Sequence, residues 1–491
     1  MKPQASSAFD PDSCEPPIHH LPSEILLEIA SYCIQSEACL RDLVRLTLVC
    51  KRWRVIIEDS SVIWSTINAV EGSTMVRKAL RKAEDTTLHL TFDEYTTQMT
   101  REEFFKSIGE RIEHWRALVV DLKSNNWDFV LEDLKKRNAP NLETLRLSGS
   151  TGAERMEGMV TLFEGHPGPP GLRDITLSHI RINLSSLQLI GLKSLMLKNT
   201  PTVSFTDILN IITASPNIES IQLRYLEWLV TPLPQQVSNS GGNLGKPSIQ
   251  LASLIGLALE NLPALSVNYL LSIIDAPLLQ TLEVDCELER PQDAQNILAG
   301  LSNQTPNLAR LVADAQMFKL SISNDAYYRI RIGGLDLTLP MDELPLDCSQ
   351  ETLEWVFNQL ANPLKDLPSH LDLDDWAPEL SKLEWLTRRM NVTKLTLHSD
   401  PYFGPPLEAI IPFFSRPTAS TPVIWLFPQI EIIETNLVWE NGNTDIVEMI
   451  KNRHSAGDDK DGATPKPFRE IWLSYGGKVD RKPPPVNLDF L

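Results

Sequence analysis

Residues 21–64 decide how the chain begins to fold, and they read LPSEILLEIASYCIQSEACLRDLVRLTLVCKRWRVIIEDSSVIW. Pro22 suits the first turn of a helix, because the N–H that proline lacks would have no partner there. Apolar residues then recur at helical spacing, first at Ile25, Leu26 and Ile29 and again over residues 43–53. The stretch therefore predicts two or three short helices. About 45 residues bury too small a core to be self-sufficient, so we expect apolar surface that a neighbouring domain or a partner covers.

The order of residues in this stretch resembles an F-box. The matching elements are Leu21-Pro22, Glu24-Ile25-Leu26, Ile29, Leu43, Leu46, Val49-Cys50-Lys51-Arg52-Trp53-Arg54 and Trp64. The alternative is an ordinary small helical bundle, in which the leucines and tryptophans are core residues and nothing more. Such a bundle has no reason to combine the Leu-Pro start, the Val-Cys-Lys-Arg-Trp run and the later tryptophan, so we favour the F-box.

The resemblance implies a partner. In the F-box family this helical module binds the adaptor subunit of SCF-type cullin–RING ubiquitin ligases, and the rest of the chain selects the protein that is ubiquitylated. Carried over from the family, the residues expected to contact the adaptor are Leu21, Pro22, Ile25, Leu26, Ile29, Val49, Cys50 and Trp53. Trp64 is expected to close the core of the module itself. The connection from Cys33 to Leu40 is longer than the usual short turn, which leaves the position of the second helix open.

Composition excludes several classes of protein. The chain has 491 residues, more than one compact core, and its 42% hydrophobic and 22% charged content is ordinary for a globular protein. A formal net charge of −19 argues against a nucleic-acid partner, because such binding depends on Lys and Arg. Six scattered cysteines favour a reducing, intracellular compartment. No apolar run reaches the roughly 18 residues of a membrane helix, so we expect no membrane contact.

The rest of the chain repeats a short pattern, apolar-x-x-apolar-x-apolar. Clear copies begin at residues 142, 172, 192, 218, 254, 279, 308 and 392, and weaker copies begin at 115, 332, 430 and 468. Several follow a turn that contains proline, such as Ala139-Pro140-Asn141 or Thr305-Pro306-Asn307. The first copies are spaced close to the period of roughly 20 to 29 residues that leucine-rich repeats have. Each unit would supply one strand, and its leucines would be buried only when neighbouring units stack.

These patterns predict an α/β fold. An all-helical F-box module would precede an irregular leucine-rich-repeat solenoid, with a parallel sheet on the concave side and helices on the convex side. Another α/β arrangement, in which strands and helices alternate, is the alternative. The predicted segments are a disordered tail (1–17), the F-box module (18–66), a linking segment or irregular first repeat (67–110), the repeat domain (111–476) with a mobile loop near 231–248, and a proline-rich tail (477–491).

The repeat register also predicts which residues could touch a target protein. Side chains alternate along a strand, so the residues beside the second apolar position of each copy would face the concave surface. The candidates are Arg146, Thr176, Met196, Gln222, Glu283, Arg310 and Lys394. This mixture is neither a charged stripe nor an aromatic platform, and most of these residues taken alone are expected to be simply solvated. It indicates no class of target.

A search for catalytic motifs finds none. The sequence has no GxSxG, HExxH or GxxxxGK[ST] motif, and no cluster of Cys and His with metal-ligand spacing. We therefore expect no catalytic residue, metal or cofactor. Two functions remain open: a subunit that recognises targets for an SCF ligase, contacting the adaptor and through it the cullin, or an interaction scaffold with no ligase role.

Overall fold

The computed structural model describes most of the chain in two compact units. The described residues are 21–33, 39–97, 99–123, 127, 132, 134–150, 159–164, 168–185, 187, 189–226, 229, 248–286, 291–323, 327–340, 353–355, 357–358, 367–374, 380–398, 411–419, 424–435, 443–456 and 465–473. The first unit contains residues 1–194 and 200–203, and the second contains residues 195–199 and 204–491. The predicted tails at 1–17 and 477–491, and the predicted mobile loop apart from residue 248, lie outside the described residues.

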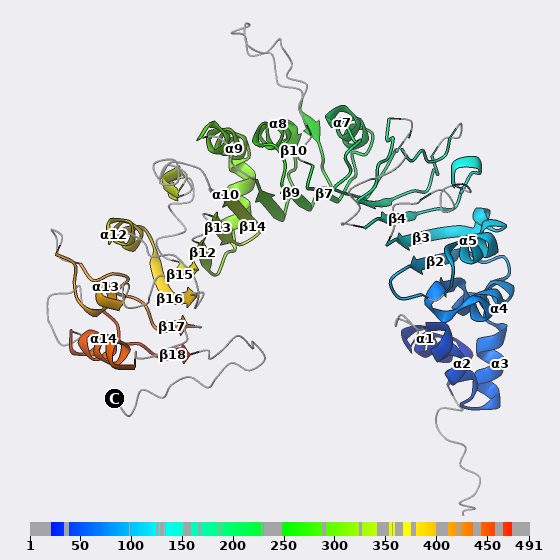
Figure 1. The fold of residues 1–491 in the computed structure, drawn as a ribbon, viewed down its shortest axis with the longest axis horizontal. Helices are drawn as coiled ribbons and strands as arrows, with labels where there is room; N and C mark the ends of the chain where they lie inside the picture. Colours follow the sequence, from blue (N-terminus) through cyan, green and yellow to red (C-terminus); the bar gives the residue numbers. More distant parts are fainter. Residues whose placement is uncertain are drawn as a thin grey trace, which may run out of the picture. The chain divides into compact units, whose positions relative to one another are not determined.

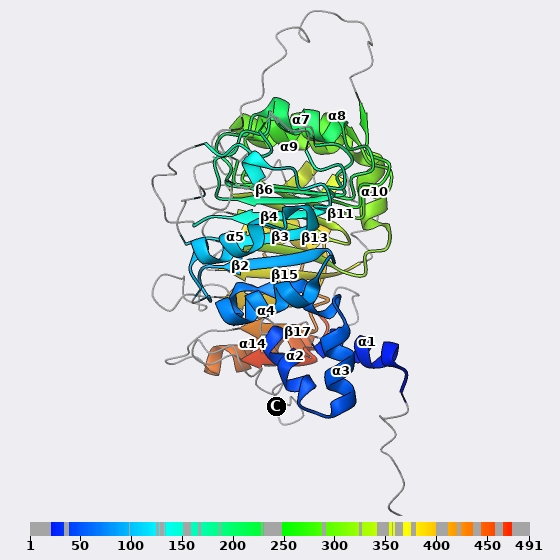
Figure 2. The same ribbon diagram turned by 90° about the vertical axis from the view of Figure 1, so that its right-hand side faces the viewer.

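The first unit begins with three helices that pack against one another. They are α1 (Ser23–Cys33), α2 (Cys39–Thr47) and α3 (Lys51–Asp59), shown together in Figure 2. α1 begins directly after Pro22, as the sequence predicts, because proline fits the first turn of a helix. The buried residues of the three helices include Leu26, Ala30, Leu40, Leu43, Trp53 and Ile57.

A parallel sheet follows the helices in the first unit. Its elements are η3 (Ile63–Ser65), β1 (Thr66–Asn68), η4 (Ala69–Glu71), α4 (Ser73–Ala83), β2 (Leu88–Asp93), α5 (Arg101–Gly109), η5 (Ile112–His114), β3 (Trp115–Asp121), β4 (Thr144–Ser148) and β5 (Asp174–Ser178). The strands pair in chain order from β1 to β5. The segment predicted as a join or an irregular first repeat thus contains β1, α4, β2 and α5. Figure 1 shows α4 and α5 beside the first strands.

The second unit contains a larger, mostly parallel sheet. Its elements are β6 (Ser194–Lys198, whose first residue belongs to the first unit), α7 (Phe205–Thr213), β7 (Ser220–Arg224), β8 (Ile249–Gln250), β9 (Gly256–Glu260), α8 (Ala264–Ile273), β10 (Ile274–Asp275), β11 (Thr281–Asp285), α9 (Pro291–Asn303), α10 (Thr305–Ala313), β12 (Phe318–Ser323), β13 (Tyr327–Ile332), β14 (Leu335–Pro340), β15 (Pro368–Asp374), α12 (Leu380–Arg389), β16 (Asn391–His398), α13 (Ile411–Ser415), β17 (Ile432–Thr435), α14 (Asn443–Ala456) and β18 (Glu470–Leu473). The order is β6-β7-β9-β11-β14-β13-β12-β15-β16-β17-β18, and β13 runs antiparallel to both of its neighbours. Helices α7, α8 and α9 lie side by side along the strands (Figure 1).

Many of the strands are entered through the same backbone turn. The N–H groups of Leu142, Leu172, Ile218, Leu254, Leu279 and Ile430 each donate to the carbonyl three residues earlier. In five of these six turns a proline occupies the second position, where its fixed φ is favourable. Seven of the eight clear copies of the apolar pattern, those at residues 142, 172, 192, 218, 254, 279 and 392, contain a strand. This confirms the prediction that these copies form strands.

The prediction of a strand at the copy that begins at Leu308 is wrong, because this segment belongs to the helix α10. Thr305-Pro306-Asn307 resembles the turns that precede strands, but here Pro306 occupies the first turn of a helix, which its fixed φ suits equally well. The weak copy at Ile332 also differs from a simple strand. Ile332 ends β13, Gly333-Gly334 make the turn, and β14 returns antiparallel to β13.

Candidate functional site

The three N-terminal helices expose an unusual amount of apolar side chain. Ile25 and Tyr32 on α1 are 40% and 66% exposed, Leu48 and Val49 in the turn before α3 are 69% and 61% exposed, and Val55 on α3 is 51% exposed. Ile25 and Tyr32 are seven residues apart and therefore share one side of α1. Single exposed apolar residues are normal on a protein surface, and these five on three short helices are candidates for contact with a partner. We call these five residues the apolar face.

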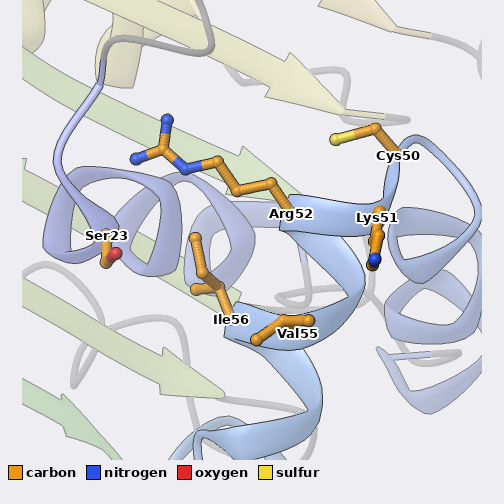
Figure 3. Close-up of a pocket in the computed structure, with 6 residues that line it drawn as sticks. All are labelled: Ser23, Cys50, Lys51, Arg52, Val55 and Ile56. Atoms are coloured by element: carbon orange, nitrogen blue, oxygen red, sulfur yellow. The ribbon is translucent and has the colours of Figure 1, made fainter.

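A cavity of about 660 Å³ opens between α1 and α3. Its lining residues are Ser23, Cys50, Lys51, Arg52, Val55 and Ile56. Figure 3 shows Arg52 extending from α3 toward the start of α1. The Arg52 guanidinium donates a hydrogen bond to the carbonyl of Leu21, so it ties the segment that leads into α1 to the first turn of α3. The cavity thus combines an apolar wall with a rim of two cationic side chains.

The structure divides the predicted adaptor contacts into three groups. Pro22, Ile25 and Val49 are exposed, and Leu21, Ile29 and Cys50 are half-buried. Leu26 and Trp53, which are 1% and 5% exposed, are buried in the core of the three helices. These two side chains therefore serve the core of the helices in this structure, and the contact of all eight residues with the adaptor stays a prediction.

The apolar face includes residues that the sequence interpretation missed. Tyr32 continues the side of α1 that carries Ile25 and Ile29, so helical spacing alone could have identified it. Leu48 directly precedes Val49 in the turn and is likewise exposed. Val55 gives no such signal in the sequence, because it lies between buried positions of α3. Trp64, by contrast, is 0% exposed and donates its indole N–H to the Ile57 carbonyl at 2.8 Å, which confirms that it closes the core of the module.

The predicted target-facing residues do not form one set. Six of them lie on strands and are exposed or half-buried: Arg146, Thr176, Met196, Gln222, Glu283 and Lys394. Arg310 lies on α10, where its guanidinium donates to the carbonyls of Ala276, Pro277 and Leu279, so its prediction as a residue on a strand was wrong.

Cross-strand register brings some of these strand residues together. Arg146 and Thr176 are direct neighbours on β4 and β5. Gln222 and Glu283 both pair with Ala258, so they lie in one row across β7, β9 and β11.

Charged side chains gather on the same face of the second unit. Arg224 lies 3.0 Å from Glu260 and 3.8 Å from Glu283, and Arg329 and Arg331 both bind Asp336. Burial raises the pKa of Glu260 and also that of Asp285. Arginine side chains pair with most of the acidic side chains on this face. The face therefore has no strong net charge of either sign.

A second polar group lies further along the same sheet. His370 is buried, its Nε2 lies 2.6 Å from the Thr396 hydroxyl, and burial lowers its pKa to about 4. Lys319 pairs with Asp372 at 2.9 Å, and Lys394 pairs with Glu434 at 2.6 Å.

Two further searches cover the described residues alone. Within them, no group of three or more His, Cys, Asp or Glu side chains is placed to hold a metal ion. No helix in that part of the chain has the length and apolar character needed to cross a membrane.

Comparison with known proteins identifies the helical module. A family model described as F-box-like matches residues 18–69, a range that includes α1, α2, α3 and Trp64 and ends at the start of η4. No curated protein matches the chain. The match agrees with the exposed apolar face, because both indicate interaction with another protein. Residues 18–69 therefore form an F-box-like domain.

Proposed function

We propose that this protein is the target-recognition subunit of an SCF-type cullin–RING ubiquitin ligase. In this proposal the F-box-like domain binds a Skp1-type adaptor, as F-box domains typically do, and the adaptor connects the chain to the cullin. The sheets of the remaining chain bind a protein target. The chain supplies proximity between target and ligase, and the transfer chemistry belongs to other subunits.

The observation that carries the proposal is the apolar face of the F-box-like domain. The five residues of this face stay exposed, whereas another side of α1 buries Leu26 and Ala30. Covering exposed apolar surface is the main favourable contribution to most protein association. We propose that a side chain of the adaptor enters the neighbouring open cavity between α1 and α3.

For the rest of the chain, we propose an irregular leucine-rich-repeat solenoid. Its support is the repetition of one local arrangement: a proline turn, then a short parallel strand with alternating buried residues. The residue after the strand has positive φ in several copies, at His179, Asn199, Tyr225 and Asn261. Such repetition is what stacked units of one kind produce.

Capture of the adaptor by the full-length chain tests the proposal. We expect the wild-type protein to recover adaptor and cullin from a cell extract, and to bind purified adaptor. The double variant Ile25→Asp, Val49→Asp should lose binding, because each apolar anchor contributes roughly 1–3 kcal/mol. Leu278→Asp is the matched control, since Leu278 is 58% exposed but lies outside the F-box-like domain.

Two results would contradict the proposal in different ways. If the wild-type chain recovers neither adaptor nor cullin, the ligase role is wrong and an interaction scaffold is the better description. If the double variant binds adaptor as tightly as the control, the adaptor uses a surface other than the apolar face.

A further inference from the structure

Glu71 connects the turn that follows β1 to the first turn of α2. It lies in η4, two residues beyond the range that the family model matches. Its Oε1 accepts hydrogen bonds from the backbone N–H groups of Leu40 and Arg41, at 3.1 and 3.2 Å. Its Oε2 lies 3.9 Å from Nε of Arg41, and the side chain is 1% exposed. A carboxylate is thus buried against a helix that lies some 30 residues earlier in the chain.

The contact between Glu71 and α2 is favourable because it is made at the N-terminus of the helix. That helix begins at Cys39, so Leu40 and Arg41 belong to its first turn. The first N–H groups of a helix have no partner within the helix, and this end carries the positive pole of the helix dipole. A negatively charged acceptor there is more favourable than a neutral one.

Glu71 itself is held firmly by the sheet. The Asn68 side chain accepts from the Val70 N–H at 3.1 Å, and the carbonyl of Ala69 accepts from the Thr97 hydroxyl at 2.7 Å. Gly72 follows with φ of 80°, a conformation that favours glycine. The strand before this turn, β1, pairs with β2. The carboxylate therefore projects from a turn whose position the sheet sets.

Two contacts of α4 reinforce the junction. Lys78 lies over the ring of Trp64, with Nζ 5.0 Å from the ring centre. Lys82 donates to the carbonyl of Glu58, near the end of α3, at 3.2 Å. The end of α3 and the start of α2 are thus both attached to elements that follow the F-box-like domain.

We propose that Glu71 is a positioning residue that fixes α2, and with it the three N-terminal helices, against η4 and the sheet that begins with β1. The domain is then not carried on a loose linker, and adaptor binding stabilises β1 and β2 as well as the helices. That the adaptor is the partner in this inference rests on the proposed function. The contact between Glu71 and α2 does not depend on it.

Hydrogen exchange of the full-length protein tests the inference, with and without purified adaptor. Without adaptor, Glu71→Ala should speed exchange in the first turn of α2, and Glu71→Gln, which keeps an acceptor oxygen, should restore part of the protection. Asp59→Ala is the matched control, because it removes an exposed carboxylate from α3. With adaptor at about 100 times its Kd, exchange in β1 and β2 should slow by up to about 100-fold in wild type. In Glu71→Ala that slowing should be lost although adaptor still binds.

The outcomes separate this inference from the proposed function. If Glu71→Ala leaves exchange in α2 unchanged, or leaves the slowing of β1 and β2 intact, the positioning role is wrong. If wild type does not bind adaptor, the proposed function fails, while the exchange of α2 without adaptor still decides whether Glu71 holds the helix. If Glu71→Ala does not fold, Glu71→Gln serves in both measurements.

Discussion

Single residues of the F-box-like domain have sharply different roles according to which side of a helix they occupy. Ile25 and Leu26 are adjacent and chemically alike, yet Ile25 is 40% exposed and Leu26 is 1% exposed. The sequence predicts that both are important, because both belong to the apolar pattern. It cannot separate them, since α1 has an apolar side toward its own core and another toward solvent. That separation requires the packing of α1 on α3, which involves residues far apart in the chain.

Trp64 gives the clearest prediction for a single core residue. Replacing Trp64 with Ala should lower the free energy of unfolding by about 3–5 kcal/mol, because it leaves a cavity and removes the hydrogen bond to Ile57. Urea denaturation followed by circular dichroism measures the loss. Val62→Ala, at a position that is 70% exposed, should change the stability by no more than about 0.5 kcal/mol. Equal effects of the two substitutions would show that Trp64 is not a core residue.

His370 predicts a pH dependence. Its pKa is lowered to about 4 in the folded protein from the ordinary value of 6.5, mainly by burial and also by Lys319 and Lys394, whereas Asp372 and Glu434 oppose the shift. The unfolded chain therefore binds the proton more tightly, and the stability that neutral His370 contributes is lost as the pH falls from about 6.5 toward 4. His370→Gln should have a shallower loss of stability over this range. Denaturation at several pH values measures both slopes, and parallel slopes would contradict the assignment.

At the scale of elements, local signals predict the strands but not every connection between them. Alternating leucines such as Leu145 and Leu147 predict β4 correctly, because a strand needs only its own alternation. Thr305-Pro306-Asn307 misleads, because proline fits the second position of a turn and the first turn of a helix equally well. The hairpin of β13 and β14 was not predicted, since its pairing depends on a close approach of Gly333 and Gly334 to other segments.

This approach predicts the effect of a glycine substitution. A Cβ at position 334 would clash with the carbonyl oxygen of Gln280, a backbone atom that cannot turn aside. Gly334→Ala should therefore destabilise the second unit by roughly 3 kcal/mol, at the upper end of the usual cost of overpacking. Gly256→Ala is the control, because its Cβ would lie 3.1 Å from the Thr281 hydroxyl, which can rotate. Thermal unfolding compares them, and an equal shift in Tm would contradict the clash.

At the scale of the whole molecule, charge opposes the compact state. The formal net charge is −19, and repulsion between like charges favours expansion of the chain. The ion pairs on the strands act in the opposite direction, but most of them are partly exposed and contribute little.

Added salt should therefore raise the stability of the protein. Between 20 and 300 mM sodium chloride at pH 7.5, salt screens repulsion among the acids more than it weakens the scattered ion pairs. We expect Tm to rise across this range by on the order of a few degrees. Differential scanning calorimetry measures it. A fall in Tm would show that the charge pairs of the sheets contribute more than the net charge costs.

The apolar face also has a consequence for the lifetime of the protein in a cell. Leu48 and Val49 are exposed to solvent. Until a partner covers them, such apolar side chains can bind other copies of the chain, chaperones or proteases. We therefore expect copies made in excess of a partner to be degraded or to aggregate, and co-expression with a partner to raise the yield of purified protein.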